Sequence, residues 1–159
     1  MKIDIICVGK IKEEFTRAAI AEYTKRLGRY ADISIIEVGD EPAPENASPA
    51  IEDKIRQKEG ERIARHIAPD AFVFALEIKG RELSSEELAE KIEDLGVMGK
   101  SHLQFIIGGS IGLAKKISDS ADFKLSFSKM TFPHQLMRVI LLEQIYRGMR
   151  IINHEPYHK

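Results

Sequence analysis

The stretch Leu103-Gln104-Phe105-Ile106-Ile107-Gly108-Gly109-Ser110-Ile111-Gly112 decides the fold of this chain. Its first half is a short apolar run rich in β-branched and aromatic residues, which predicts a buried strand. Its second half is a glycine-rich turn, and a glycine backbone can approach a ligand closely because it carries no Cβ. A buried strand that ends in such a turn is typical of an α/β sheet with a ligand at its edge.

Strand and helix patterns alternate along the rest of the 159 residues. Strands are predicted over residues 3–8, 33–38, 71–76, 103–107 and 124–127, and helices over residues 13–27, 49–68, 85–96, 113–117 and 134–153. The alternation implies βαβ units, so we expect an α/β fold with a mostly parallel sheet and helices on both faces. A chain of this length is expected to form one domain over residues 1–159.

Helical spacing of apolar residues predicts the faces that the helices bury. The first helix presents Phe15, Ala18, Ala19, Tyr23 and Leu27, the second Ile51, Ile55, Ile63 and Ile67, and the third Leu88, Ile92 and Leu95. Ser48-Pro49 predicts the start of the second helix and Pro69 its end, and Ser84-Ser85-Glu86-Glu87 is a capping box. The last helix is apolar on two faces, Leu136, Val139, Leu142 and Ile145 beside Met137, Ile140, Leu141 and Met149. One face can cover the sheet, so the other predicts a partner in a twofold homodimer.

The net charge of −1 argues against a protein that coats nucleic acid by bulk electrostatics. The charge is uneven, since residues 37–53 hold six acids and no Lys or Arg, and residues 124–159 hold six Lys or Arg against two acids. Either these clusters lie on solvated faces by chance, or the C-terminal segment presents a basic surface to an anionic partner.

The chain has no apolar run near the roughly 18 residues of a membrane span, and Asp4 interrupts the place where a signal peptide needs apolar residues. The one cysteine, Cys7, excludes an internal disulfide and a multi-cysteine zinc site, and its strand position predicts a small core residue. These features predict a cytoplasmic protein without a membrane partner.

In a parallel sheet, ligands bind outside the carboxyl ends of the strands. Those ends are predicted at residues 9–10, 39–40, 77–81, 108–112 and 128–132. The turn at residues 108–112 is neither a P-loop nor a G-x-G-x-x-G dinucleotide motif. On pattern alone it is either a ligand-binding turn or a plain tight turn.

Two further segments carry candidate chemistry. Residues 127–135 mix Phe127, Met130 and Phe132 with polar groups, so they form either an apolar-walled pocket suited to an adenine and thioether ligand or a partly buried connection. His154-Glu155-Pro156-Tyr157-His158 matches the H-E-x-x-H zinc motif, but Pro156 breaks the helix that this site needs. We therefore expect no metal. Residues 154–159 have little apolar content, so we also expect a mobile tail that becomes ordered over its target.

Four segments are distinctive in combination: Ile107-Gly108-Gly109-Ser110-Ile111-Gly112, Leu125-Ser126-Phe127-Ser128-Lys129-Met130-Thr131-Phe132-Pro133-His134-Gln135, Glu143-Gln144-Ile145-Tyr146-Arg147 and Pro156-Tyr157-His158. Together they resemble the RlmH family of SPOUT-class methyltransferases, which act on large-subunit ribosomal RNA. The resemblance extends over essentially the whole chain.

The resemblance implies a SPOUT methyltransferase fold with a C-terminal trefoil knot, a homodimer, and S-adenosylmethionine as methyl donor. The implied reaction is methylation of N3 of a pseudouridine in helix 69 of 23S ribosomal RNA, on the assembled ribosome. By the family's pattern the cofactor would be held at Leu76, Gly108, Phe127, Ser128, Lys129, Met130, Thr131 and Phe132. The same resemblance points to His158, Tyr157 and Arg147 as the catalytic residues.

The N3–H of a uracil-like base must lose its proton before the nitrogen becomes a good nucleophile. Histidine is the usual general base near neutral pH, and arginine can stabilise charge that develops on the base oxygens. Which of the three residues removes the proton stays open. Two other classes also stay open: a Rossmann-like oxidoreductase that binds a dinucleotide at residues 108–112, and a non-catalytic protein that binds the ribosome.

Overall fold

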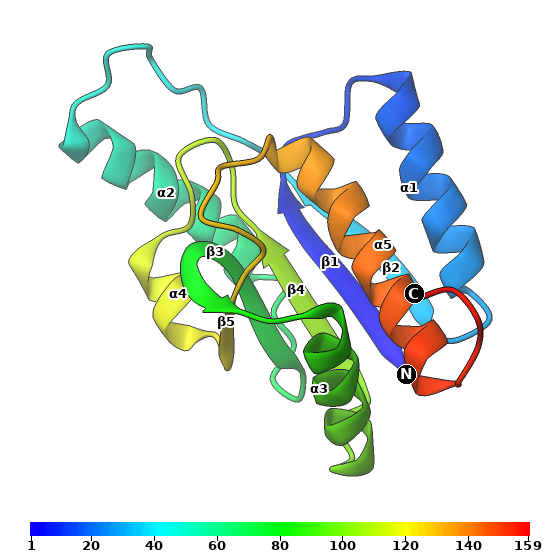
Figure 1. Cartoon of the computed structure of the whole chain (residues 1–159). Coiled ribbons are helices and arrows are strands. Elements are labelled where there is room, and N and C mark those ends of the chain that lie inside the picture. Colours follow the sequence, from blue (N-terminus) through cyan, green and yellow to red (C-terminus); the bar gives the residue numbers. More distant parts are fainter.

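The computed structural model describes residues 1–159 and contains one five-stranded sheet, in the order β2-β1-β4-β3-β5, whose neighbouring strands are all parallel (Figure 1). The strands are β1 Lys2–Val8, β2 Asp32–Val38, β3 Phe72–Glu82, β4 His102–Ile107 and β5 Phe123–Ser126. The helices are α1 Glu14–Leu27, α2 Pro49–Ala64, α3 Ser85–Val97, α4 Lys115–Ser120 and α5 His134–Ile152. The predicted α/β class with a parallel sheet is confirmed, whereas the trefoil knot stays a prediction.

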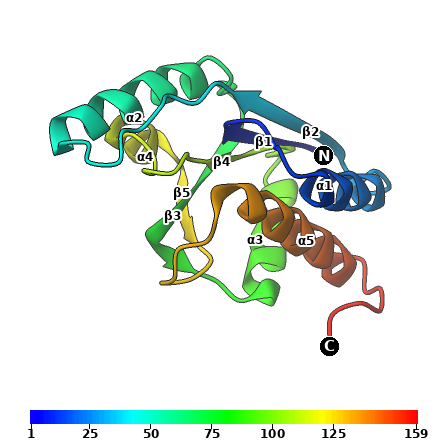
Figure 2. The same ribbon diagram turned by 90° about the horizontal axis from the view of Figure 1, so that it is seen from above.

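Helices cover both faces of the sheet, with α1, α3 and α5 on one side and α2 and α4 on the other (Figure 2). The first side holds a core of 18 buried apolar residues and the second a core of eight. Cys7 lies in the larger core, as predicted, and burial raises the pKa of its thiol to about 11. None of the helices combines the length and the apolar character that crossing a bilayer would require.

The third strand departs from its prediction. We expected it to end at Leu76, but β3 continues to Glu82. It pairs with Leu125 of β5 first through Leu76 and then, after a register shift, through Arg81. The intervening residues form a bulge, which takes them out of the ladder at the carboxyl end of the sheet. A bulge of this kind re-aims side chains, and residues 77–79 face the cavity described below.

The helix starts follow their predicted capping signals. Ser48 accepts a hydrogen bond from the Ile51 N–H, and Ser84 and Glu87 form both bonds of the capping box. The predicted end of α2 at Pro69 is wrong, because the helix ends at Ala64. Its Ile51 was predicted on the buried face and is exposed.

The predicted face of α1 is also partly wrong. Phe15 is 73% exposed, and the helix buries Thr16 instead, with Ile20 and Tyr23 partly buried beside it. Successive residues on a helix differ by about 100° in direction. The prediction placed Phe15 on the buried face because its side chain is large and apolar and fits the spacing, but the face that packs on the core is centred on neighbouring residues.

The last helix packs between two neighbours, α1 and α3, as well as on the sheet. One of the two predicted apolar faces was expected to be surplus, but Leu142 and Ile145 of one face and Leu141 and Met149 of the other are buried within this one chain. Leu136 remains 42% exposed, and Val139 is partly exposed. The apolar surface left for a partner is thus smaller than predicted and lies at the start of the helix.

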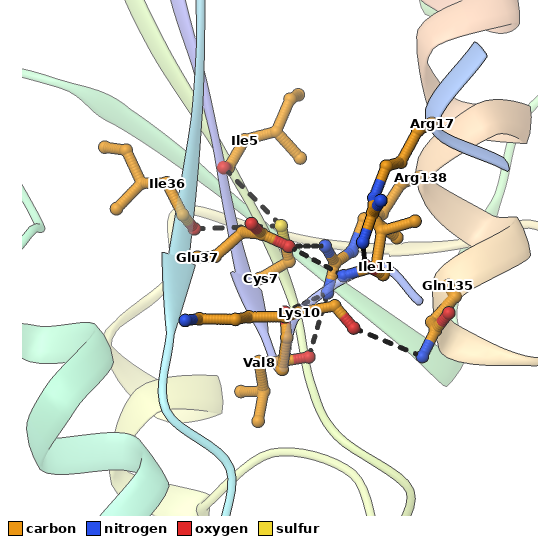
Figure 3. Close-up of polar contacts among 11 residues, drawn as sticks. Ile5, Cys7, Val8, Lys10, Ile11, Arg17, Ile36, Glu37, Gln135 and Arg138 are labelled. Atoms are coloured by element: carbon orange, nitrogen blue, oxygen red, sulfur yellow. Dashed lines mark hydrogen bonds and ion pairs between the residues drawn. The ribbon is translucent and has the colours of Figure 1, made fainter. Parts of the chain in front are cut away.

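A buried arginine anchors the start of α5 to the sheet (Figure 3). Arg138 is 0% exposed, and its guanidinium donates to Glu37 Oε2 at 2.7 Å and to the backbone oxygens of Val8 and Gly9 at 3.0 and 2.6 Å. Glu37 also accepts a hydrogen bond from the Ile11 N–H at 3.0 Å. These bonds fix α5 to the carboxyl ends of β1 and β2.

Candidate functional site

A cavity of about 990 Å³ opens at the carboxyl ends of β3, β4 and β5. Its walls come from the β3 bulge, the glycine turn after β4 and the loop between β5 and α5. Three of the five predicted strand ends contribute, whereas residues 9–10 and 39–40 do not line it. Its volume is within the range of small-molecule and cofactor sites.

The residues predicted to hold a cofactor gather at this cavity. Leu76, Gly108 and five of the six residues 127–132 line it, and only Lys129 does not. The aromatic rings of Phe127 and Phe132 belong to the apolar part of the wall. An apolar cleft with a few polar groups is the usual form of a site for a small organic ligand.

The glycine turn has a shape that only glycines allow. Gly109 and Gly112 pair in an isolated bridge, so the turn closes on itself. A Cβ on Gly108 would lie 2.9 Å from the carbonyl carbon of Gly112, which is closer than a Cβ tolerates. Gly112 has φ +84°, in the left-handed region that glycine favours. At its three glycines the turn therefore presents backbone without a side chain to the cavity, which Ser110 and Ile111 also line.

Sequence reasoning missed two polar side chains of the wall, Arg56 and His134. Arg56 Nη1 donates to the Ile111 backbone oxygen at 3.1 Å, which secures the glycine turn from α2. The ring of His134 forms no hydrogen bond within the chain, and burial and the nearby Arg138 charge lower its pKa. His134 stands in the segment that carried the resemblance, so a signal existed; the position of Arg56 in the sequence gave none.

The three predicted catalytic residues also lie together, around Glu143 of α5. Glu143 Oε1 accepts from Arg147 Nη2 at 2.7 Å and from the Tyr157 hydroxyl at 3.0 Å. The Arg147 guanidinium lies over the Tyr157 ring, 4.8 Å from its centroid. His158 Nδ1 is 3.3 Å from Arg147 Nη1, and its Nε2 is 2.7 Å from Glu86 Oε1.

The pKa shifts divide the roles that these side chains can take. Burial and the bond to Glu143 raise the pKa of Tyr157 to about 12, so the phenol stays protonated at neutral pH. The hydrogen bond to Glu143 raises the pKa of Arg147, which keeps the guanidinium charged. Arg147 and Tyr157 can therefore donate hydrogen bonds, and His158 is the one member of the set that can accept a proton.

The C-terminal tail is more firmly held than its composition indicated. The chain reverses at His154, which has φ +53°, and runs back along α5 (Figure 1). The Tyr157 ring packs edge-on against Tyr146 with centroids 4.9 Å apart, and Glu155 Oε2 pairs with Arg150 at 2.6 Å. One aromatic contact and several ion pairs therefore hold the tail in this structure, and its predicted mobility without substrate stays a prediction.

The cavity and the catalytic set are not brought together within one chain. None of the three residues lines the cavity. Met137 of the cavity and Arg147 stand ten residues apart on α5, which corresponds to about 15 Å along the helix axis. The two predicted halves of the site therefore lie toward opposite ends of α5.

One interpretation of the C-terminal charge was a basic surface for an anionic partner. In the structure, the three arginines of this segment pair with acids of the same chain. Arg138 is buried against Glu37, Arg147 pairs with Glu143, and Arg150 pairs with Glu155. Glu155 and His158 of the H-E-x-x-H string are likewise engaged elsewhere, and no group of three candidate metal ligands occurs in the chain.

Comparisons with known proteins agree with this geometry. The family described as "Predicted SPOUT methyltransferase" matches residues 1–158. A Bifidobacterium adolescentis protein named ribosomal RNA large subunit methyltransferase H is 64% identical over 159 residues, all of both chains. A Methanococcus maripaludis protein, named as a putative enzyme of the same kind, is 63% identical over 159 residues, also all of both chains.

One solved structure shares the fold at much lower identity. It is a probable methylase family protein from Haemophilus influenzae, which matches with a TM-score of 0.56 at 14% identity over 99% of this chain and 70% of that chain. The full-length relatives and the family match together lead to one assignment. The chain belongs to the SPOUT methyltransferase family and, within it, to the group of ribosomal RNA large subunit methyltransferase H proteins, RlmH.

Proposed function

We propose that this protein transfers a methyl group from S-adenosylmethionine to N3 of a pseudouridine in helix 69 of 23S ribosomal RNA, on the assembled ribosome. The names of its relatives supply the class of RNA. The resemblance of its motifs supplies the base, the nitrogen and the helix. A protein with this substrate works in the cytoplasm, where ribosomes are found.

The observation that carries the proposal is the convergence of Leu76, Gly108 and residues 127–132 on one cavity. Its apolar wall suits an adenine ring, and the bare backbone of the glycine turn suits the hydrogen-bonding groups of the cofactor. S-adenosylmethionine, when bound, supplies a methyl group activated by a sulfonium. The protein's own part is to hold donor and acceptor in line, which by itself lowers the barrier substantially.

The catalytic set supplies polar contacts for the acceptor base. Arg147 and Tyr157 are donors, so they suit the carbonyl oxygens on which negative charge develops when N3 ionises. The imidazole of His158 completes the set at its outer edge, between Arg147 and Glu86. We assign these three residues to the binding and activation of the base.

The distance between the cavity and the catalytic set supports a homodimer. Two copies with antiparallel α5 helices, related by a twofold axis, would bring the tail of one beside the cavity of the other. Phe15 and Leu136, exposed near the starts of α1 and α5, provide apolar surface for such a contact (Figure 1). One active site would then need residues from both copies.

Light scattering at micromolar concentration is expected to give twice the 18.0 kDa mass of the chain. Leu136→Glu should shift the protein toward monomer and reduce methyl transfer, because a charge in an apolar contact is costly. Val97→Glu, at an exposed position at the end of α3, is the matched control and should change neither property. A stable monomer with full activity would refute the dimer.

Ribosomes from a strain that lacks the corresponding gene provide the direct test of function. We expect tritium to be transferred from the methyl group of S-adenosylmethionine to 23S RNA. Mass spectrometry should then locate the added methyl group on N3 of one pseudouridine in helix 69. Calorimetry should show binding of S-adenosylmethionine and no binding of NAD. Incorporation at another helix, or binding without transfer, would contradict the proposed reaction.

Gly108→Val is expected to weaken S-adenosylmethionine binding by about 5- to 150-fold, which corresponds to roughly 1–3 kcal/mol of overpacking. The valine side chain would collide with the Gly112 backbone and distort the turn. Gly99→Val is the control, because a valine at the positive φ of Gly99 strains the backbone far from the cavity, between α3 and β4. Isothermal titration calorimetry measures both, and equal binding by Gly108→Val and the parent protein would mean that the cavity is wrongly assigned.

A further inference from the structure

The side of the cavity nearest β1 holds a histidine with an unusual setting. His134 lines the cavity, and neither of its ring nitrogens forms a hydrogen bond within the chain. If Gly9 carried a Cβ, its nearest neighbours would be the Asp40 side chain and His134 Nε2, each at 3.9 Å. The imidazole and the Asp40 side chain therefore both lie beside Gly9, which has φ +86°.

His134 lies on a different side of the cavity from most of the cofactor residues, although it follows Phe132 by two positions. Those residues stand at the ends of β3, β4 and β5, whereas His134 lies beside Gly9, at the end of β1, the strand on the other side of β4. The cavity extends from one group to the other. A volume of about 990 Å³ leaves room for a second planar group next to a bound cofactor.

Few side chains of the cavity can accept a proton. Glu77 is one of them, but it already accepts a hydrogen bond from Ser118 Oγ at 2.8 Å. Arg56 and Lys79 are cations. His134 is thus the one side chain of the lining that has a basic nitrogen and forms no hydrogen bond within the chain.

We propose that His134 accepts the N3 proton of the target base, with the negative charge of Asp40 nearby to favour the protonated ring. This inference rests on the proposed function. The proton moves from N3 to a ring nitrogen of His134, and the electron pair left on N3 forms the new bond to the methyl carbon. The electrons of the broken carbon–sulfur bond stay on sulfur, and the imidazolium later returns its proton to water.

The charges around His134 suit this role. Burial and the positive charge of Arg138, on the same helix, lower the pKa of His134, so the imidazole is neutral and able to accept a proton at pH 7. Asp40, from the loop after β2, acts in the other direction and stabilises the imidazolium once it forms. Arg138 in turn pairs with Glu37, which offsets part of the positive charge near the ring (Figure 3).

The test is a pH profile of single-turnover methylation on ribosomes. The parent protein should show a rate that rises through a midpoint below pH 6.5, the ordinary pKa of histidine, and is then flat. His134→Gln should lose about 100-fold near pH 7.5, and its rate should rise about tenfold per pH unit, since only spontaneously ionised base reacts. Asp40→Asn should keep the plateau, and its midpoint should move to lower pH.

Two further readouts separate catalysis from folding. The NMR titration of the His134 ring in the protein without ribosomes should give the same midpoint as the kinetics, and Asp40→Asn should lower both. Calorimetry should show S-adenosylmethionine binding within about threefold of the parent for His134→Gln. His66→Gln, an exposed histidine that does not line the cavity, should leave the profile unchanged.

The outcomes decide between the two histidines and between the two proposals. If His134→Gln keeps the flat profile while His158→Ala acquires the steep one, the proton goes to His158 and the inference is wrong. If His134→Gln binds the cofactor and methylates like the parent, His134 has no such role. If the parent protein itself does not methylate ribosomes, the proposed function fails, and the inference fails with it.

Discussion

Replacing Arg138 with methionine is expected to lower the free energy of unfolding by about 3 kcal/mol. Methionine fills much of the volume but donates no hydrogen bond, so the backbone oxygens of Val8 and Gly9 lose the bonds that Arg138 now gives them. Glu37 loses its buried counter-charge at the same time. In a chain of this size the midpoint of thermal unfolding should fall by roughly 6–12 °C, measured at a fixed protein concentration.

Arg17→Met is the matched control. Arg17 donates to the Ile11 backbone oxygen and pairs with Glu14, but its side chain is largely exposed, so we expect a loss below about 1 kcal/mol. A double-mutant cycle with Glu37→Gln should show coupling to Arg138, because a 2.7 Å ion pair joins the buried guanidinium to the partly exposed carboxylate. Equal effects of Arg138→Met and Arg17→Met would show that the buried bonds contribute little to stability.

Deleting Tyr157, His158 and Lys159 is expected to slow methyl transfer by about 100-fold, the usual size of a lost positioned group. The affinity for S-adenosylmethionine should change little, because no tail residue lines the cavity. Cofactor titration and single-turnover methylation on the same truncated protein measure the two effects side by side. His158→Ala, which keeps the Tyr157 packing, should cost at least about tenfold.

Glu86→Gln serves as the control for the tail. It removes the charge that faces His158 from α3 and leaves the three catalytic side chains in place, so its effect on the rate should be much smaller than that of the deletion. Unchanged methylation by the truncated protein would remove the tail from catalysis. Loss of cofactor binding would show that the tail is part of the fold and not of the reaction.

The order of strands and helices could be predicted because each element carries a local signal. The run at residues 71–76 is apolar throughout, as expected of a strand that is covered on both faces. In the structure the rings of Phe74 and Phe105, on neighbouring strands, stack with centroids 4.5 Å apart. A parallel sheet predicts that a ligand binds at the carboxyl ends of its strands. The turn at residues 108–112 follows one of these ends and lies in the wall of the cavity. Local patterns thus predicted where a site would lie.

Features that depend on distant partners could not be predicted in this way. The burial of Arg138 depends on Glu37, 101 residues earlier, and on the carbonyls of a strand end. The packing of Tyr157 depends on how the chain reverses at His154. Lys129 falls among the cofactor residues in sequence but not in the wall of the cavity, because spacing along a loop does not determine which side chains face inward.

The strand order determines when each strand can find its partners while the chain is synthesised on the ribosome. β1 ends at Val8, but β4, which pairs with it along Lys2–Cys7, begins only at His102. At about 5–20 residues per second, the edge of β1 that β4 will cover stays open for roughly 5–20 s of synthesis. During that interval an apolar strand with unpaired backbone groups is exposed to other nascent chains. Among the strands of the sheet, β1 therefore waits longest for its second neighbour, although in the finished fold it is among the most buried.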